Sequence, residues 1–158
     1  MKKLFFEVRP SSIQGLGAFA TRPIRKRTRI IEYTGERITP AEADRRYNDN
    51  ESTHPHVLLF SVDRRTVIDA GVGGNEARFI NHSCEPNCET LTQQRRVYIE
   101  ALRDILEGEE LSYDYNLTRD DNDTNELEQH YTCHCRTKTC RGTMLRPRSA
   151  TKQRRKTS

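Results

Sequence analysis

The side chains best suited to chemistry in this sequence are its five cysteines. They are Cys84, Cys88, Cys133, Cys135 and Cys140. The last three form the pattern C-x-C-x4-C within eight residues, so their thiolates can converge on one cation. A closed structural zinc site takes four ligands, and the fourth must be Cys84 or Cys88, because His134 lies between two cysteines and should point away. Disulfides are a weaker explanation, since the sequence shows no secretion signal. Ordinary buried thiols are also a weaker explanation, because the neighbouring residues are polar and basic.

A glycine-containing stretch, QGLGAFATRP at residues 14–23, is the second candidate for ligand binding. Gly15, Gly17 and Ala20 have the spacing of a dinucleotide-binding fingerprint. That fingerprint requires a helix directly after the glycine turn, because the helix N-terminus holds the phosphates. Pro23 would break such a helix six residues after Gly17. We therefore expect the glycines to let the backbone lie flat against some other ligand.

Short strands must position these residues. Strands are predicted at residues 3–8, 29–35, 57–62, 66–70, 95–102 and 110–115. A helix is predicted over residues 39–48, where Thr39 can cap, Pro40 suits the first turn and Glu42 completes a capping box. A shorter helical turn is predicted in residues 74–81. Without regular alternation of strands and helices, a parallel α/β sheet is not expected.

The composition indicates one domain with a modest core. The chain has 158 residues, of which 33% are hydrophobic and 32% charged, and it has no Trp. This apolar share is low, which favours stabilisation by a metal or bound ligand. No apolar run is long enough to span a bilayer, and MKKLFFEV is too short for a signal peptide. We expect a soluble, intracellular protein with no membrane contact.

The charges are divided unequally along the chain. Residues 129–158 hold nine of the 27 Lys and Arg and no Asp or Glu, which leaves 18 basic against 23 acidic side chains in the first 128 residues. An acidic body favours a cationic partner. The basic end is either a disordered polar terminus or contacts nucleic acid or another polyanion.

Several motifs occur in an order that resembles the SET-domain protein lysine methyltransferases. ARFINHSCEPNCE follows YTGE and precedes GEELSYDY, and CHCRTKTC resembles the post-SET zinc motif of that family. The resemblance covers about residues 5–145. It implies a mainly β SET fold with short helices, in which small curved β-sheets surround a pseudoknot of the NHS and YDY strands. The implied parts are a SET domain (4–117), an acidic connecting loop (118–128), a zinc-bound post-SET segment (129–145) and a basic disordered tail (146–158).

The resemblance also implies two bound groups, S-adenosyl-L-methionine and Zn²⁺. The positions that match cofactor contacts in the family are Gln14, Gly15, Leu16, Gly17, Asn81, His82 and His134. Among them, Gly17 would permit close approach of the cofactor and His134 would pack on the adenine. The positions that match zinc ligands are Cys84, Cys133, Cys135 and Cys140, which leaves Cys88 over, with exchange of Cys84 and Cys88 as the open alternative.

Methyl transfer to lysine requires a neutral amine held in line with the methyl group and its sulfur, so positioning groups suffice without a dedicated base. Tyrosines suit this task because each offers an aromatic wall and an un-ionised hydroxyl. By resemblance, Tyr115 matches the catalytic tyrosine, Tyr33 a wall of the lysine channel, and Tyr113 the position that governs methylation degree. A Tyr at that position implies mainly monomethylation.

Two departures limit what the resemblance implies. Many relatives have a Tyr that contacts the cofactor where this chain has Leu58. The sequence begins almost at the domain, which resembles compact, stand-alone microbial members and implies the cytoplasm, with the nucleus or chromatin, including that of a host, as the alternative. The substrate is expected to be a basic, histone-like or other Lys-rich segment. The tail SATKQRRKTS resembles a histone tail, so Lys152 or Lys156 is a hypothetical automethylation site.

Three functions are compatible with these features. The first is an S-adenosylmethionine-dependent protein-lysine N-methyltransferase. The second is a catalytically idle SET module that binds protein or nucleic acid through its zinc-ordered basic end. The third is a zinc-dependent nucleic-acid binder, which the tail permits and the acidic body disfavours. Tyr115, Asn81 and His82 are all present, which favours the enzyme.

Overall fold

The computed structural model describes residues 3–47, 58–119 and 125–148 of the chain. Within these ranges short strands form four small sheets, accompanied by two short helices and a 3-10 turn. The mainly β class predicted from the sequence is thereby confirmed. Lys152 and Lys156, the hypothetical automethylation sites, lie outside the described residues.

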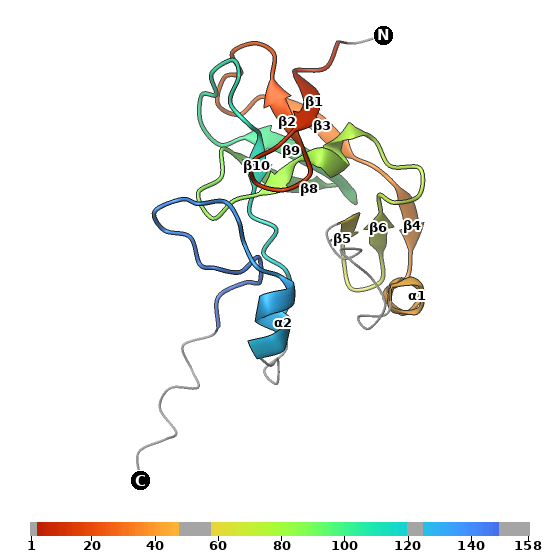
Figure 1. The fold of residues 1–158 in the computed structure, drawn as a ribbon. Coiled ribbons are helices and arrows are strands. Elements are labelled where there is room, and N and C mark those ends of the chain that lie inside the picture. The colour runs from red at the N-terminus through yellow and green to blue at the C-terminus, as the bar shows by residue number, and fades with distance from the viewer. Residues whose placement is uncertain (1–2, 48–57, 120–124, 149–158) are drawn as a thin grey trace.

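The centre of the molecule is an antiparallel sheet of order β3-β9-β8, beside a hairpin of β1 and β2 (Figure 1). These strands are β1 (Phe6–Pro10), β2 (Leu16–Ala20), β3 (Arg29–Tyr33), β8 (Cys88–Gln93) and β9 (Arg96–Ala101). Alternate side chains of β9, including Val97 and Ile99, are fully buried, as expected for a strand with one face on the core. No helix follows Gly15 and Gly17, so the chain lacks the helix of a dinucleotide-binding fingerprint there.

A second sheet of order β4-β6-β5 lies to one side of this centre, next to helix α1 (Figure 1). Its elements are β4 (Glu36–Ile38), β5 (Leu59–Ser61), β6 (Val67–Asp69) and α1 (Pro40–Arg46). The strands predicted at residues 57–62 and 66–70 are confirmed, and they pair as an antiparallel hairpin of β5 and β6. The predicted helix is also confirmed, since the Glu42 amide donates to Thr39 Oγ1 at 3.1 Å. The predicted capping box is only half formed, because the Glu42 carboxylate accepts hydrogen bonds from Arg45 and Arg46 instead of from the Thr39 amide.

The predicted crossing of the NHS and YDY segments is a two-residue parallel pair. Strand β7 (Asn81–His82) pairs with β10 (Ser112–Tyr113), so that Asn81 is opposite Ser112 and His82 opposite Tyr113. The 3-10 turn η2 (Glu76–Phe79), where a short helical turn was predicted, leads directly into β7. Sequence-distant segments thus meet at one buried place, and the residues on either side of the pair are brought together.

The C-terminal segment differs from the prediction in one respect. The acidic connecting loop expected over residues 118–128 contains the start of helix α2 (Asn125–His130), so that prediction was wrong for residues 125–128. Glutamates in the first turn favour the helix, because they complement the positive end of its dipole. Glu128 also accepts hydrogen bonds from Arg119 at 2.7 Å and Arg148 at 3.0 Å, which ties the helix to its flanks.

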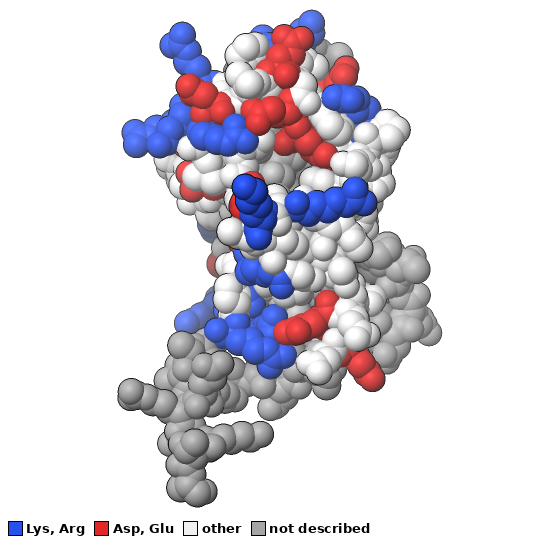
Figure 2. Space-filling view, turned by 60° about the vertical axis from the view of Figure 1, so that its left-hand side comes forward, with Lys and Arg blue, Asp and Glu red and all other residues white. Residues whose placement is uncertain are grey.

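Lys and Arg side chains are interspersed with Asp and Glu on the face shown in Figure 2. The described part of this face therefore carries no large patch of a single sign. Across residues 3–47, 58–119 and 125–148, no helix has the length and apolar character needed to cross a bilayer.

Candidate functional site

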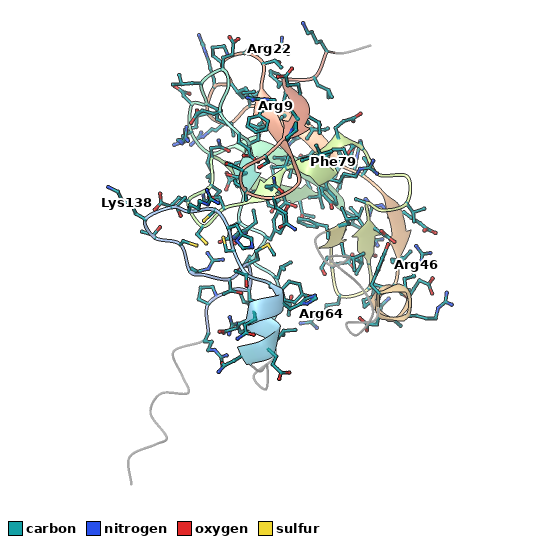
Figure 3. All side chains as sticks on the ribbon, in the orientation of Figure 1. Arg9, Arg22, Arg46, Arg64, Phe79 and Lys138 are labelled. Atoms are coloured by element: carbon teal, nitrogen blue, oxygen red, sulfur yellow. The ribbon has the colours of Figure 1, made fainter. Side chains whose placement is uncertain are left out.

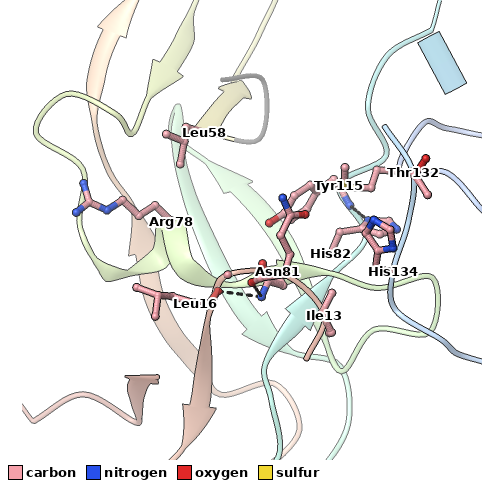
Figure 4. Close-up of a pocket in the computed structure, with 12 residues that line it drawn as sticks. Ile13, Leu16, Leu58, Arg78, Asn81, His82, Tyr115, Thr132 and His134 are labelled. Atoms are coloured by element: carbon pink, nitrogen blue, oxygen red, sulfur yellow. Dashed lines mark hydrogen bonds between the residues drawn. The ribbon is translucent and has the colours of Figure 1, made fainter. Parts of the chain in front are cut away.

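A pocket of about 220 Å³ lies where the β1–β2 turn, β7 and the C-terminal segment meet (Figure 4). Its walls come from segments far apart in the sequence. The lining residues are Ile13, Gln14, Gly15, Leu16, Leu58, Arg78, Asn81, His82, Tyr115, Thr132, His134 and Met144. All of the sequence-predicted cofactor residues except Gly17 are among them, and so is Tyr115.

The Asn81 carboxamide is held in one orientation. Its Nδ2 donates toward Gln14 O at 3.1 Å and Leu16 O at 3.0 Å (Figure 4). It also donates toward Glu110 Oε1 at 3.0 Å. All three partners are acceptors only, so exchanging the amide nitrogen and oxygen would be unfavourable. The Asn81 oxygen remains available to accept a hydrogen bond from a donor in the pocket.

Gly17 contributes by leaving room for Glu110. A Cβ at this position would collide with Glu110 Oε1 and come within 2.9 Å of Ser11 Cβ. Glu110 Oε1 also accepts a hydrogen bond from Ser11 Oγ at 2.7 Å. The close approach expected at Gly17 is therefore made by this chain's own carboxylate, which ties the β1–β2 turn to Asn81.

His82 connects the pocket to the cysteines. Its Nδ1 accepts the Tyr115 backbone N–H at 3.0 Å, so the ring proton belongs on Nε2, which lies 3.5 Å from Cys84 Sγ. Burial lowers the pKa of His82 to about 4, with Asp114 opposing and Arg141 reinforcing the shift. The imidazole is therefore neutral near pH 7.

Three tyrosines gather beside the pocket, although only Tyr115 lines it. Its hydroxyl donates to Ile80 O at 2.7 Å, and its ring centroid lies 4.8 Å from that of the buried Tyr113. Tyr33 is also buried and donates to Leu58 O at 2.9 Å. Burial is the main cause that raises the pKa of each of the three phenols, so all stay un-ionised.

Four cysteine sulfurs converge in the C-terminal part of the domain, and Figure 3 shows sulfur atoms (yellow) gathered beside the loop that carries Lys138. The Sγ atoms of Cys84, Cys133, Cys135 and Cys140 all lie within 4.8 Å of one another. Cys84 and Cys133 are 3.7 Å apart. A tetrahedron with zinc–sulfur bonds of about 2.3 Å has edges of about 3.8 Å. The donor set therefore fits a zinc ion, and it supports the predicted post-SET motif.

The thiol environments differ within and outside this cluster. Burial raises the pKa of the Cys135 thiol, but hydrogen bonds, the strongest from Thr137, outweigh burial and lower it to about 6. This shift favours the thiolate that metals bind. Cys88 lies elsewhere, fully buried in β8, where burial raises its pKa to about 12. Its Sγ donates to Asn87 Oδ1 at 3.4 Å, so Cys88 belongs to the core.

Sequence reasoning missed four lining residues: Ile13, Arg78, Thr132 and Met144. Arg78 could have been found, because a cation three residues before Asn81 shares the turn that enters β7. Thr132 and Met144 carry no local signal. They reach the pocket because the chain pairs Thr132 with Thr143 and folds back over the cysteines.

Comparison with known proteins agrees with this architecture. The family model of the SET domain matches residues 15–116, so the chain belongs to the SET domain family. It is 43% identical over 136 residues to Histone-lysine N-methyltransferase trr of Drosophila melanogaster. The aligned region covers 83% of this chain and 5% of that protein.

Two further relatives give the same result. Identity is 42% over 139 residues with Histone-lysine N-methyltransferase, H3 lysine-4 specific, of Saccharomyces cerevisiae (84% of this chain, 12% of that protein). It is 39% over 136 residues with Histone-lysine N-methyltransferase 2D of Homo sapiens (83% and 2%). The chain thus spans only a small part of the length of these relatives.

Proposed function

We propose that this chain is a protein-lysine N-methyltransferase that uses S-adenosyl-L-methionine. The observation that carries the proposal is the single pocket wall on which Asn81, His82 and Tyr115 come together, next to a sulfur cluster. Membership of the SET domain family and the names of the relatives support it.

The pocket has the groups that such a cofactor requires. Asn81 offers a fixed amide oxygen to the ammonium group, and Arg78 offers a cation to the carboxylate. His134 lines the opposite side, where its ring can pack on the adenine. Gln14, Gly15 and Leu16 present main chain to the ligand, and Leu58 supplies apolar contact in place of a tyrosine.

The bound cofactor supplies an electrophilic methyl group on a positively charged sulfur. A neutral lysine amine would accept this methyl group, so that a nitrogen–carbon bond would replace the carbon–sulfur bond, whose electron pair would stay on sulfur. The resulting methylammonium loses its proton to solvent. The chain's own task is alignment in a site that excludes water, because well-oriented geometry can lower the barrier by as much as roughly 7–11 kcal/mol.

The tyrosines have separate roles in this proposal. Tyr115 lines the pocket and orients the reacting groups, with its hydroxyl anchored on Ile80 O. Tyr33 forms a wall of the lysine channel. Tyr113 holds the amine or a water and so restricts the product mainly to monomethyl-lysine.

Zinc held by Cys84, Cys133, Cys135 and Cys140 would order the segment that carries Thr132, His134 and Met144. The domain limits proposed from the sequence, 4–117 for SET and 129–145 for post-SET, accommodate both sites. A basic protein segment, histone-like in view of the relatives' names, is the proposed substrate, and it would be met at chromatin.

The proposal is tested with zinc-loaded protein, methyl-labelled cofactor and a panel of histones, other basic proteins and cell lysate. Transfer of label to lysine, abolished by chelation, is expected. Cofactor binding by calorimetry without any transfer would favour an idle module. The absence of both binding and transfer would overturn the proposal.

A further inference from the structure

A bidentate ion pair joins the cysteine-rich segment to the tyrosine strand. Arg141 Nη1 donates to Asp114 Oδ2 at 2.8 Å and Nη2 to Asp114 Oδ1 at 2.9 Å. The two side chains are only 24% and 34% exposed. Parallel bonds between a guanidinium and a carboxylate fix relative orientation as well as distance. Neither residue lines the pocket.

Each partner is next to a different part of the site. Arg141 follows Cys140, and its backbone N–H lies 3.4 Å from Cys84 Sγ, to which it donates. Asp114 stands between Tyr113 and Tyr115, and its Oδ1 also accepts the Asn116 N–H at 2.9 Å. The pair is therefore a short physical link between the sulfur cluster and the tyrosines.

Burial of the Arg141 guanidinium at this place has an energetic cost. Its Nε is buried and has no hydrogen-bond partner within the described ranges. An unsatisfied buried N–H is destabilising, so the two bonds to Asp114 must offset it. Nη2 adds only a long contact of 3.5 Å to Leu145 O.

A second polar contact of the same segment provides a comparison. Thr139 donates to Glu85 Oε1 through both its backbone N–H, at 3.0 Å, and its Oγ1, at 2.6 Å. This contact is exposed and holds the loop that contains Cys135 and Cys140 without touching a tyrosine. It stabilises the loop but has no connection to the pocket.

We propose that the Asp114–Arg141 pair is a positioning device that sets how the metal-held segment lies over the cofactor pocket. This inference rests on the proposed function. Three of the four cysteines belong to the segment itself, so the metal would join it to the rest of the domain through Cys84 alone and would leave rotation about that one bond open. The pair removes this freedom, so that Thr132, His134 and Met144 face Tyr115 and close the far wall.

The test compares Arg141→Lys, Arg141→Ala and Asp114→Asn with Thr139→Val as the matched control. Zinc content is measured by titration with a chromophoric chelator, and S-adenosylmethionine affinity by calorimetry. We expect all four variants to bind zinc like the wild type. The three pair variants should bind the cofactor about tenfold more weakly, the effect of one charge-assisted hydrogen bond. Arg141→Lys should not rescue, because lysine lacks the fork.

A double variant, Asp114→Ala with Arg141→Ala, should lose no more affinity than Arg141→Ala alone, since the two residues act as one unit. Hydrogen exchange of the Tyr115 amide provides a readout that does not need the cofactor. Exchange should accelerate in zinc-loaded Arg141→Lys but not in Thr139→Val, because that amide is held by His82 next to the pair.

Wild-type affinity and unchanged Tyr115 exchange in the pair variants would overturn the inference, and so would loss of zinc in parallel with loss of affinity. If the wild type itself does not bind S-adenosylmethionine, the proposed function fails. The exchange measurement then still decides the role of the pair.

Discussion

At the scale of single residues, the Tyr115 hydroxyl has the most direct predicted effect. Tyr115→Phe removes the hydrogen bond to Ile80 O but keeps the ring against Tyr113 and His82. We expect at least about a tenfold fall in kcat, or about 1.4 kcal/mol of barrier, with little change in cofactor Kd. Single-turnover transfer assays and calorimetry measure the two quantities. A large loss of cofactor affinity would instead make Tyr115 a binding residue.

Tyr113 is predicted to control the degree of methylation. Tyr113→Phe opens a small space next to the amine without changing the buried ring stack, so the product should shift from monomethyl- toward dimethyl-lysine. Mass spectrometry of the modified peptide is the measurement. Tyr98→Phe is the control, because the Tyr98 ring packs under Arg29 away from the pocket. An unchanged product distribution in Tyr113→Phe would contradict the assignment.

At the scale of elements, we expect the C-terminal segment to depend on a zinc ion more than on its own packing. Among the described residues, the buried cluster there consists of only Tyr131, Cys133, Met144 and Leu145. Removing zinc with a chelator should therefore release this segment, abolish cofactor binding and lower the melting temperature. Calorimetry before and after chelation tests this, and re-addition of zinc should restore binding. Undiminished affinity in metal-free protein would mean that the pocket closes without the cluster.

Helix α1 lies away from the pocket, so its cap can be separated from function. Thr39→Ala removes the bond to the Glu42 amide and should reduce the free energy of unfolding by about 1 kcal/mol. Denaturant unfolding measures the change, and Thr39→Ser should recover most of it. Methyl transfer by Thr39→Ala below its melting temperature is expected to match the wild type.

The elements also show what could be read from the sequence. Three elements could be predicted because their signals are local in the sequence. The β5–β6 hairpin shows apolar alternation, α1 has a capping threonine, and β9 contains β-branched residues. Strand β8 was missed because its exposed residues, Glu89 and residues 91–93, are mainly polar and its pairing to β9 is decided by tertiary contact. Helix α2 was missed because its acidic sequence resembled a loop, while ion pairs to Arg119 and Arg148 lie outside any local window.

The site was predictable to a similar extent. The pocket residues in contiguous motifs, such as Asn81 and His82, were named from the sequence. Thr132 and Met144 were not, because they reach the pocket only through the fold of the C-terminal segment. The close packing of Glu110 against Gly17 could not be predicted either, since Glu110 lies 93 residues further along the chain.

At the scale of the whole molecule, the protonation states predict the pH dependence. Burial raises the pKa of Tyr33, Tyr113 and Tyr115, so these groups do not ionise below about pH 10. In the proposed reaction the substrate lysine must lose a proton, so kcat/KM should rise with pH, with a slope near one, until the lysine is neutral. Rates measured between pH 7 and pH 10 test this. A fall toward pH 10 in protein that remains folded would implicate an ionising tyrosine.

The parallel pairing of β7 with β10 also has a consequence for how the molecule forms. Its two strands are separated by β8 and β9 along the chain, so a long loop must close before the first of its hydrogen bonds can form. Such distant pairings slow folding relative to neighbouring hairpins. After dilution from denaturant, the far-ultraviolet circular dichroism signal should therefore recover earlier than ligand affinity. The difference between the two rates would measure how late the β7–β10 pairing forms.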